Sequence, residues 1–173
     1  MVGHESANAG SSRGARGLIG WPLWIHTWAW GGMLAVVLLL IGASTGGTQA
    51  IEAVLTRMPA DGPPILIVQH MPAHFTAAFA QRLNQLSAMR VVEATSNMLL
   101  ERGTAYIAPG DYHMTVVRSG LQLRTTLNQG PPEHYQRPAV DVLFRSVAEL
   151  RGVPIVAAIL TGMGSDGADG LLA

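Results

Sequence analysis

The strongest constraint on the fold is an alternation of buried-strand patterns with helical patterns. Leu34 to Ile41 is an unbroken apolar run ending in a glycine turn, which is typical of a strand buried on both faces of a parallel sheet. Thr48 to Arg57 has helical spacing, Ile65 to Val68 again has a strand pattern, and Phe75 to Leu86 shows one apolar helical face. The alternation predicts an α/β fold with a doubly wound, mostly parallel sheet and helices on both faces.

The middle of the chain breaks this alternation. Its strand patterns are short and are separated by turns, including Gly110-Asp111 and Ser119-Gly120, so we expect a small antiparallel insertion there. The strand patterns in question are Val91 to Ala94, Thr104 to Ala108, Met114 to Val117 and Leu121 to Thr126. After them the sequence predicts a helix over Pro138 to Leu150, a buried strand over Pro154 to Leu160, and a turn over Gly162 to Gly170 that leads into a last helix.

The N-terminal part differs from the rest. We expect residues 1–32 to be a flexible or irregular lead and residues 33–173 to be the folded domain. From Gly17 to Ala43 no residue except His26 can carry a charge, and arginines precede this stretch, so it is also a candidate membrane span. Pro22 and the central glycines argue against a span, and the strand pattern of Leu34 to Ile41 competes with it for the same residues.

Composition narrows the function classes. The sequence has 173 residues, with 49% of them hydrophobic and 13% charged, which suits one domain with a sizeable core and excludes a disordered tail. Eleven basic residues balance eleven acidic ones, so the broad positive field needed to bind nucleic acid is absent. With no cysteine, disulfides, thiolate nucleophiles and cysteine zinc sites are excluded. His70 and His74 lie four apart around Pro72 without a nearby third ligand, so we expect no metal.

Gly42-Ala43-Ser44-Thr45-Gly46 has the pattern G-x-S-x-G between a predicted strand and a predicted helix. A tight strand-to-helix corner of this kind raises the serine hydroxyl above the sheet edge and directs backbone N–H groups of the next helical turn to the same place. Two alternatives remain: Ser44 could merely cap the helix, and a glycine-rich loop could bind a nucleotide, although the usual nucleotide motifs are absent.

His70 and Asp166 follow two other predicted strands. In a parallel sheet, His70 emerges at the same carboxyl edge as Ser44, and Asp166 follows the last strand at that edge. Alone, His70 could be a histidine bonded to backbone, and Asp166 could cap the helix that follows it. Together the three predict acyl transfer, in which His70 takes the proton of Ser44, Asp166 fixes the imidazole tautomer, and backbone N–H groups near the corner hold the oxyanion. The order Ser, His, Asp differs from that of ordinary α/β-hydrolases, which implies a different fold.

Five ordered blocks of the sequence resemble one known family. They are IGASTGG at Ile41 to Gly47, QHMP at Gln69 to Pro72, YIAPGDYHM at Tyr106 to Met114, RPAVDVLF at Arg137 to Phe144, and LTGMGSDG at Leu160 to Gly167. These blocks resemble the catalytic domain of the chemotaxis protein-glutamate methylesterases, the CheB family, from about Leu34 to the last residue. The resemblance assigns the catalytic triad to Ser44, His70 and Asp166, and it adds Thr45 and Met163 to the substrate site.

The resemblance also implies a substrate and a setting. The expected reaction is the hydrolysis of glutamate methyl esters on cytoplasmic chemoreceptor helices, with methanol released and with deamidation of receptor glutamines in some members. We accordingly expect a cytoplasmic, monomeric hydrolase without a cofactor. Family members usually carry an N-terminal receiver domain, and residues 1–32 show no sequence pattern of such a domain. The family's catalytic domain also usually continues beyond the aspartate loop, so we expect a domain truncated at its C-terminus. A degenerate fragment that binds receptor without turnover is the alternative.

Overall fold

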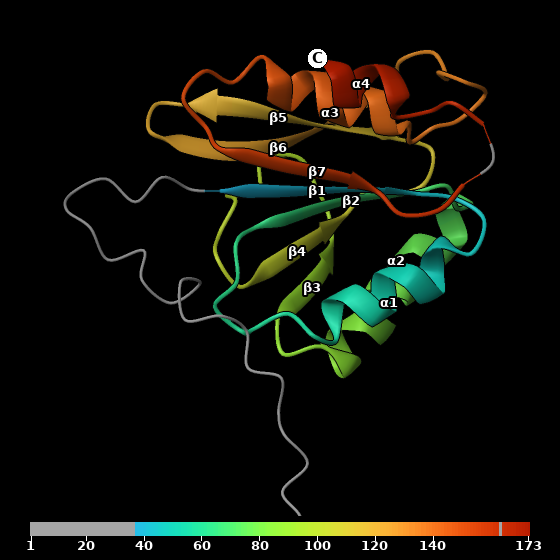
Figure 1. The fold of residues 1–173 in the computed structure, drawn as a ribbon, viewed down its shortest axis with the longest axis vertical. Helices are drawn as coiled ribbons and strands as arrows, with labels where there is room; N and C mark the ends of the chain where they lie inside the picture. Colours follow the sequence, from blue (N-terminus) through green and yellow to red (C-terminus); the bar gives the residue numbers. More distant parts are fainter. Residues whose placement is uncertain (1–36, 163) are drawn as a thin grey trace, which may run out of the picture. The chain divides into compact units, whose positions relative to one another are not determined.

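The computed structural model describes residues 37–162 and 164–173. Its main feature is a parallel sheet of five strands in the order β3-β4-β2-β1-β7, with a separate antiparallel pair β5-β6 (Figure 1). The strands are β1 (Leu38–Ala43), β2 (Ile65–Gln69), β3 (Arg90–Glu93), β4 (Thr104–Ile107), β5 (His113–Ser119), β6 (Gln122–Asn128) and β7 (Ile155–Ile159). The helices are α1 (Gly47–Leu55), α2 (Ala73–Leu86), α3 (Val140–Ala148) and α4 (Ala168–Leu172).

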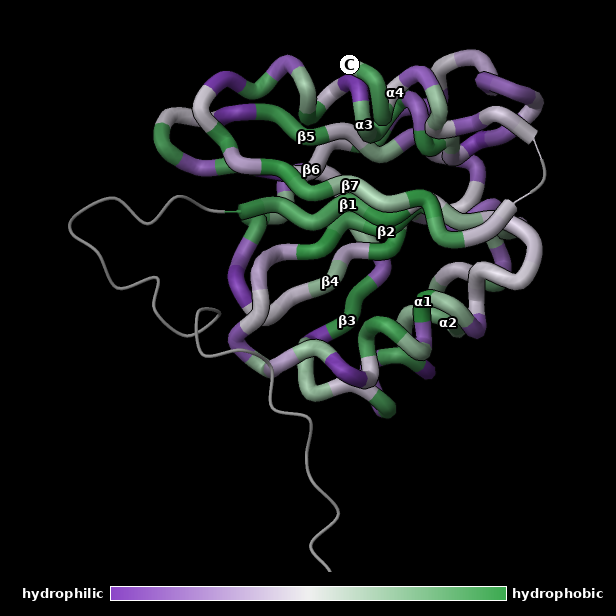
Figure 2. Tube along the Cα trace, in the orientation of Figure 1, coloured by the Kyte–Doolittle hydropathy of each residue, from purple (hydrophilic) through white to green (hydrophobic). Residues whose placement is uncertain are grey.

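Helices cover both faces of the main sheet, which confirms the predicted fold class. On one face α1 and α2 enclose a core that includes Ile51, Leu83 and Ile67. On the other face α3 and the β5-β6 hairpin enclose a second core around Tyr106 and Phe144 (Figure 1). Hydrophobic residues run almost continuously along β1 and β2 (Figure 2), as expected for strands that are buried on both sides.

The predicted antiparallel insertion is present as the β5-β6 hairpin. The assignment of the two earlier strand patterns to it is wrong, because β3 and β4 are parallel members of the main sheet. The connection from β3 to β4 holds no helix. Instead it is an extended loop that bonds to the hairpin, with Leu100 N–H donating to the carbonyl of Leu123 at 2.9 Å. A connection without a helix leaves no helical periodicity between two strands. The sequence patterns of β3 and β4 therefore resemble those of two strands in a hairpin.

The apolar run from Leu34 to Ile41 was also part of a candidate membrane span. From Leu38 onward it forms β1 and pairs in the main sheet. β1 lies between β2 and β7, with Leu39 opposite both Ile65 and Val156. The remainder of the candidate span, and the predicted lead over residues 1–32, lie outside the described residues. No helix within residues 37–162 and 164–173 is long and apolar enough to cross a membrane.

Candidate active site

Ser44 lies in the corner that joins β1 to α1. Its N–H donates to the carbonyl of Thr161 at 2.8 Å, which fixes the corner to the loop after β7. Gly46 closes the corner with φ 76°, a left-handed conformation that glycine adopts without strain, and α1 begins at Gly47. Among the described residues no side chain bonds to the N-terminus of helix α1, so Ser44 does not cap it. The capping alternative is therefore wrong.

His70 is the first residue after β2. Because β1 and β2 pair in parallel up to Ala43 and Gln69, the next N–H along the chain, that of His70, donates to the carbonyl of Ala43 at 3.0 Å. This bond continues the ladder one step beyond the strands. It places His70 beside Ser44 at the carboxyl edge, as the parallel arrangement predicts.

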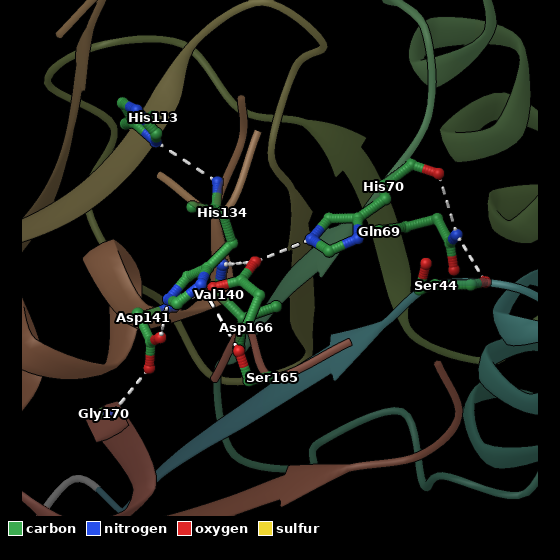
Figure 3. A network of polar contacts seen from close by, with 11 residues as sticks. Ser44, Gln69, His70, His113, His134, Val140, Asp141, Ser165, Asp166 and Gly170 are labelled. Carbon is green, nitrogen blue, oxygen red and sulfur yellow. Dashed lines mark hydrogen bonds and ion pairs between the residues drawn. The ribbon is translucent and has the colours of Figure 1, made fainter. Parts of the chain in front are cut away.

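Asp166 lies in the loop between β7 and α4, and its carboxylate accepts three hydrogen bonds. Oδ2 accepts from His70 Nε2 at 2.7 Å and from the N–H of Val140 at 2.7 Å, and Oδ1 accepts from the N–H of Asp141 at 2.9 Å (Figure 3). The side chains of His70 and Asp166 are only 11% and 5% exposed. Asp166 therefore joins the imidazole to the first turn of α3.

These bonds outweigh the effect of burial on Asp166. Burial is the largest single influence and would raise the pKa of the carboxyl group, but the bonds from His70, Asp141 and Val140 together hold its pKa below the ordinary value of 3.8. An ionised carboxylate can only accept hydrogen bonds, so the bonded Nε2 of His70 carries the hydrogen. The free lone pair is then on Nδ1, which lies on the side of the ring towards Ser44 (Figure 3).

Ser44, His70 and Asp166 line one small cavity of about 60 Å³. The other lining residues are Ala43, Val140, Ile159, Thr161, Gly162 and Gly164. Within the described residues the Ser44 hydroxyl forms no hydrogen bond to His70, and such bonds commonly tighten only when substrate is bound. Thr45 is exposed and does not line the cavity, and Met163 lies outside the described residues.

Three features of this site were not foreseen. Asp166 was considered as a cap for the helix that follows it, but its carboxylate bonds to the first turn of α3 instead, and α4 has no side-chain cap from the part of the chain that the structure describes. Gln69 is 3% exposed and bonds to the carbonyl of Ser44. Thr161 has a buried hydroxyl without a partner among the described residues. A polar residue ending an otherwise apolar strand was a signal for Gln69; the other two depend on contacts distant in sequence.

A second polar cluster lies behind the site. Within the described residues His134, Asp141 and Asp169 hold ligand-type atoms that all lie within 4.8 Å of one another. Asp141 is already engaged, because its Oδ1 accepts the N–H of Gly170 at 2.6 Å and its Oδ2 contacts His134 Nε2 at 3.0 Å. The bond from Gly170 fastens α4 to α3, and the contact with His134 holds the preceding loop, so protein groups account for the buried carboxylate.

The fold and the site together define an α/β domain whose sheet edge gathers serine, histidine and aspartate side chains around one cavity. Residues 39–173 match the family model described as CheB methylesterase. The chain belongs to the CheB methylesterase family.

Individual relatives agree with this assignment. The chain is 58% identical over 134 residues to a protein-glutamate methylesterase/protein-glutamine glutaminase 2 of Syntrophus aciditrophicus, and 56% identical over 135 residues to a protein-glutamate methylesterase/protein-glutamine glutaminase of Ralstonia nicotianae. These alignments cover 78% of this chain but 39% and 35% of the two relatives, so the chain spans less than half of their length. The crystal structure of the Thermotoga maritima CheB methylesterase catalytic domain matches with a TM-score of 0.75 and 37% identity, covering 78% of this chain and 72% of that one.

Proposed function

We propose that this domain is a serine hydrolase that removes methyl groups from glutamate methyl esters of chemoreceptors, with Ser44 as nucleophile, His70 as base and Asp166 as the group that orients His70. The observation that carries the proposal is the 2.7 Å contact between His70 Nε2 and Asp166 in a cavity that Ser44 also lines. The family relationship supports the substrate class, since the relatives are named protein-glutamate methylesterase/protein-glutamine glutaminase.

In the first half of the proposed reaction, the Ser44 hydroxyl oxygen attacks the ester carbonyl carbon while His70 Nδ1 takes the hydroxyl proton. The imidazolium that forms is stabilised by the ionised Asp166. The negative charge on the carbonyl oxygen is held by backbone N–H groups at the corner, where the N–H of Thr45 follows the nucleophile directly. The tetrahedral intermediate then expels methoxide, which His70 protonates to methanol, and an acyl-enzyme remains.

In the second half, His70 takes a proton from water, and the resulting hydroxide attacks the acyl-enzyme carbonyl. Ser44 leaves with the proton returned by His70, and the product is a glutamate side chain. A glutamine substrate would follow the same path with ammonia as the first leaving group, so deamidation needs no additional residue. We further propose that Thr45 and Met163 contact the substrate, that the substrate is the cytoplasmic helical region of a chemoreceptor, and that the domain acts there as a monomer.

The test combines a fluorophosphonate probe with methanol release from methylated receptor. The wild-type chain should be labelled at Ser44, and S44A should lose labelling and lower turnover by on the order of 10⁴-fold or more. S119A, which changes an exposed serine at the end of β5, is the matched control and should behave like wild type. Methanol release that survives in S44A would contradict the proposal, as would a folded wild-type chain that is neither labelled nor active; the latter result would favour a fragment that binds receptor without turnover.

A further inference from the structure

Gln69 is a buried amide that contacts both residues of the proposed proton transfer through their backbones. It ends β2, where the preceding residues are apolar, and its side chain is almost completely enclosed. Its Nε2 donates to the carbonyl oxygen of Ser44 at 2.9 Å and to that of His70 at 3.1 Å (Figure 3). One NH₂ group thus bridges the serine and the histidine, which are 26 positions apart in the sequence.

The Gln69 bridge lies just beyond the point where the backbone pairing between β1 and β2 ends. The pairing of β1 with β2 ends at Ala43 and Gln69, and a single further bond, from His70 N–H to the carbonyl of Ala43, continues it. Beyond that point the two segments diverge, one into α1 and the other towards α2. The Gln69 amide supplies the next connection between them, so it restrains the separation of the Ser44 and His70 backbones.

The position of the Gln69 Oε1 atom explains why residue 47 is a glycine. A Cβ atom on Gly47 would lie 2.0 Å from Gln69 Oε1 and 2.6 Å from the Cβ of Ala43. Only a residue without a side chain can therefore begin α1 against this amide. Gly46 meets a different need, its left-handed backbone, so the two adjacent glycines serve separate purposes.

The amide is not what core packing alone would select. Gln69 Oε1 is buried and has no hydrogen-bond partner among the described residues, which costs stability relative to an apolar side chain of the same shape. The reverse orientation of the amide would place Oε1 against two carbonyl oxygens, so the contacts fix the assignment. A methionine of similar length would fill the same space and remove the unsatisfied oxygen, although the carbonyl of His70 would lose the Nε2 donor.

We propose that Gln69 is a positioning residue that sets the approach of the Ser44 hydroxyl to His70 Nδ1. This inference rests on the proposed function, because it presupposes proton transfer between those two groups. Displacing reacting groups by about 1 Å can cost about 10²-fold in rate, so the loss of the bridge should appear in turnover rather than in substrate binding.

The test compares Q69M and Q69E with wild type and with Q85M, a matched change on the exposed side of α2. For each chain we would measure the rate of fluorophosphonate labelling at Ser44, kcat, KM and the melting temperature. We expect Q69M to melt near the wild-type temperature, because the two lost hydrogen bonds offset the removal of the unsatisfied oxygen, with labelling and kcat lowered by about 10²-fold and KM nearly unchanged. Q85M should match wild type in all four.

Q69E adds a readout that a purely structural role would not move. An ionised carboxylate donates no hydrogen bond to the two carbonyls, whereas a protonated one donates a single bond, so the activity of Q69E relative to wild type at the same pH should recover as the pH falls. A Q69M kcat within about threefold of wild type would overturn the inference, and so would a lower melting temperature with unchanged kcat per folded molecule. If Q69M does not fold, the inference is overturned by a Q69E activity that, relative to wild type at the same pH, does not change with pH. An unlabelled, inactive wild-type chain would instead refute the proposed function, and the inference would fall with it.

Discussion

Removal of the Asp166 carboxylate should destabilise the fold as well as the site, because Asp166 also caps α3. The residue before α3, Ala139, has no side chain that can cap, and the first-turn N–H groups of Val140 and Asp141 donate to Asp166 instead. The N–H of Asp141 lies 2.9 Å from Oδ1, and that of Val140 lies 2.7 Å from Oδ2. The first turn of α3 therefore depends on a residue that follows β7.

The magnitude follows from those two bonds. Each buried donor left without a partner costs about 1–3 kcal/mol, so D166A should lower the free energy of unfolding by about 2–6 kcal/mol. D166N keeps one acceptor oxygen but turns the other position into a donor that faces an N–H group, so about half of that loss is expected. Asp61, an exposed aspartate in the turn before β2, provides the control, and D61A should stay within about 0.5 kcal/mol of wild type.

Urea unfolding at pH 7, followed by circular dichroism, measures these differences. The pH dependence gives a second reading. The folded pKa of Asp166 lies below its unfolded value near 3.8, so its stabilising contribution is complete above that value and is lost as the pH falls through the folded pKa. The difference in the free energy of unfolding between wild type and D166N should thus be largest near neutral pH and should decrease below pH 3.8. If D166A were no less stable than D61A at pH 7, the capping role would be disproved.

Two further substitutions probe the walls of the cavity. T161V replaces a buried hydroxyl that has no partner among the described residues, so its melting temperature should equal or exceed that of wild type; a fall of several degrees would reveal a partner for that hydroxyl. G42A should lower the free energy of unfolding by about 1–3 kcal/mol in urea titrations, because the new Cβ would lie 2.5 Å from Val140 Cγ1; an unchanged midpoint would show that α3 yields without cost.

The sequence was sufficient to predict the sheet edge because Ser44 and His70 each directly follow a strand that has a strong apolar pattern. Ser44 and His70 come one residue after β1 and β2, and parallel pairing brings the ends of adjacent strands together. The same reasoning failed for β3 and β4, since their connection is a loop whose partner is the β5-β6 hairpin. The periodicity of apolar residues indicates which side chains are buried locally. It does not indicate which two strands pair with each other after a loop.

Contacts that span the chain were beyond sequence reasoning. The bridge from Gln69 to the Ser44 carbonyl depends on the rotamer of one amide and on the absence of a side chain at Gly47. The ring nitrogen of His70 that faces Asp166 depends on how the imidazole is turned. Motif spacing fixes neither of these, although both decide which atoms can exchange a proton.

The position of Asp166 is a different problem from that of Ser44 or His70, because strand order alone does not bring it to the imidazole. β1 lies between β2 and β7, so the ends of the latter two strands are about 10 Å apart, and a carboxylate held only by the end of β7 would not reach His70. The loop after β7 instead carries Asp166 to the first turn of α3, whose two N–H groups hold it against the ring. Helix α3 is thus the element that completes the serine-histidine-aspartate arrangement. The RPAVDVLF block at Arg137 to Phe144, which contributes no side chain to the proposed proton transfer, supplies the two backbone donors on which the position of Asp166 depends.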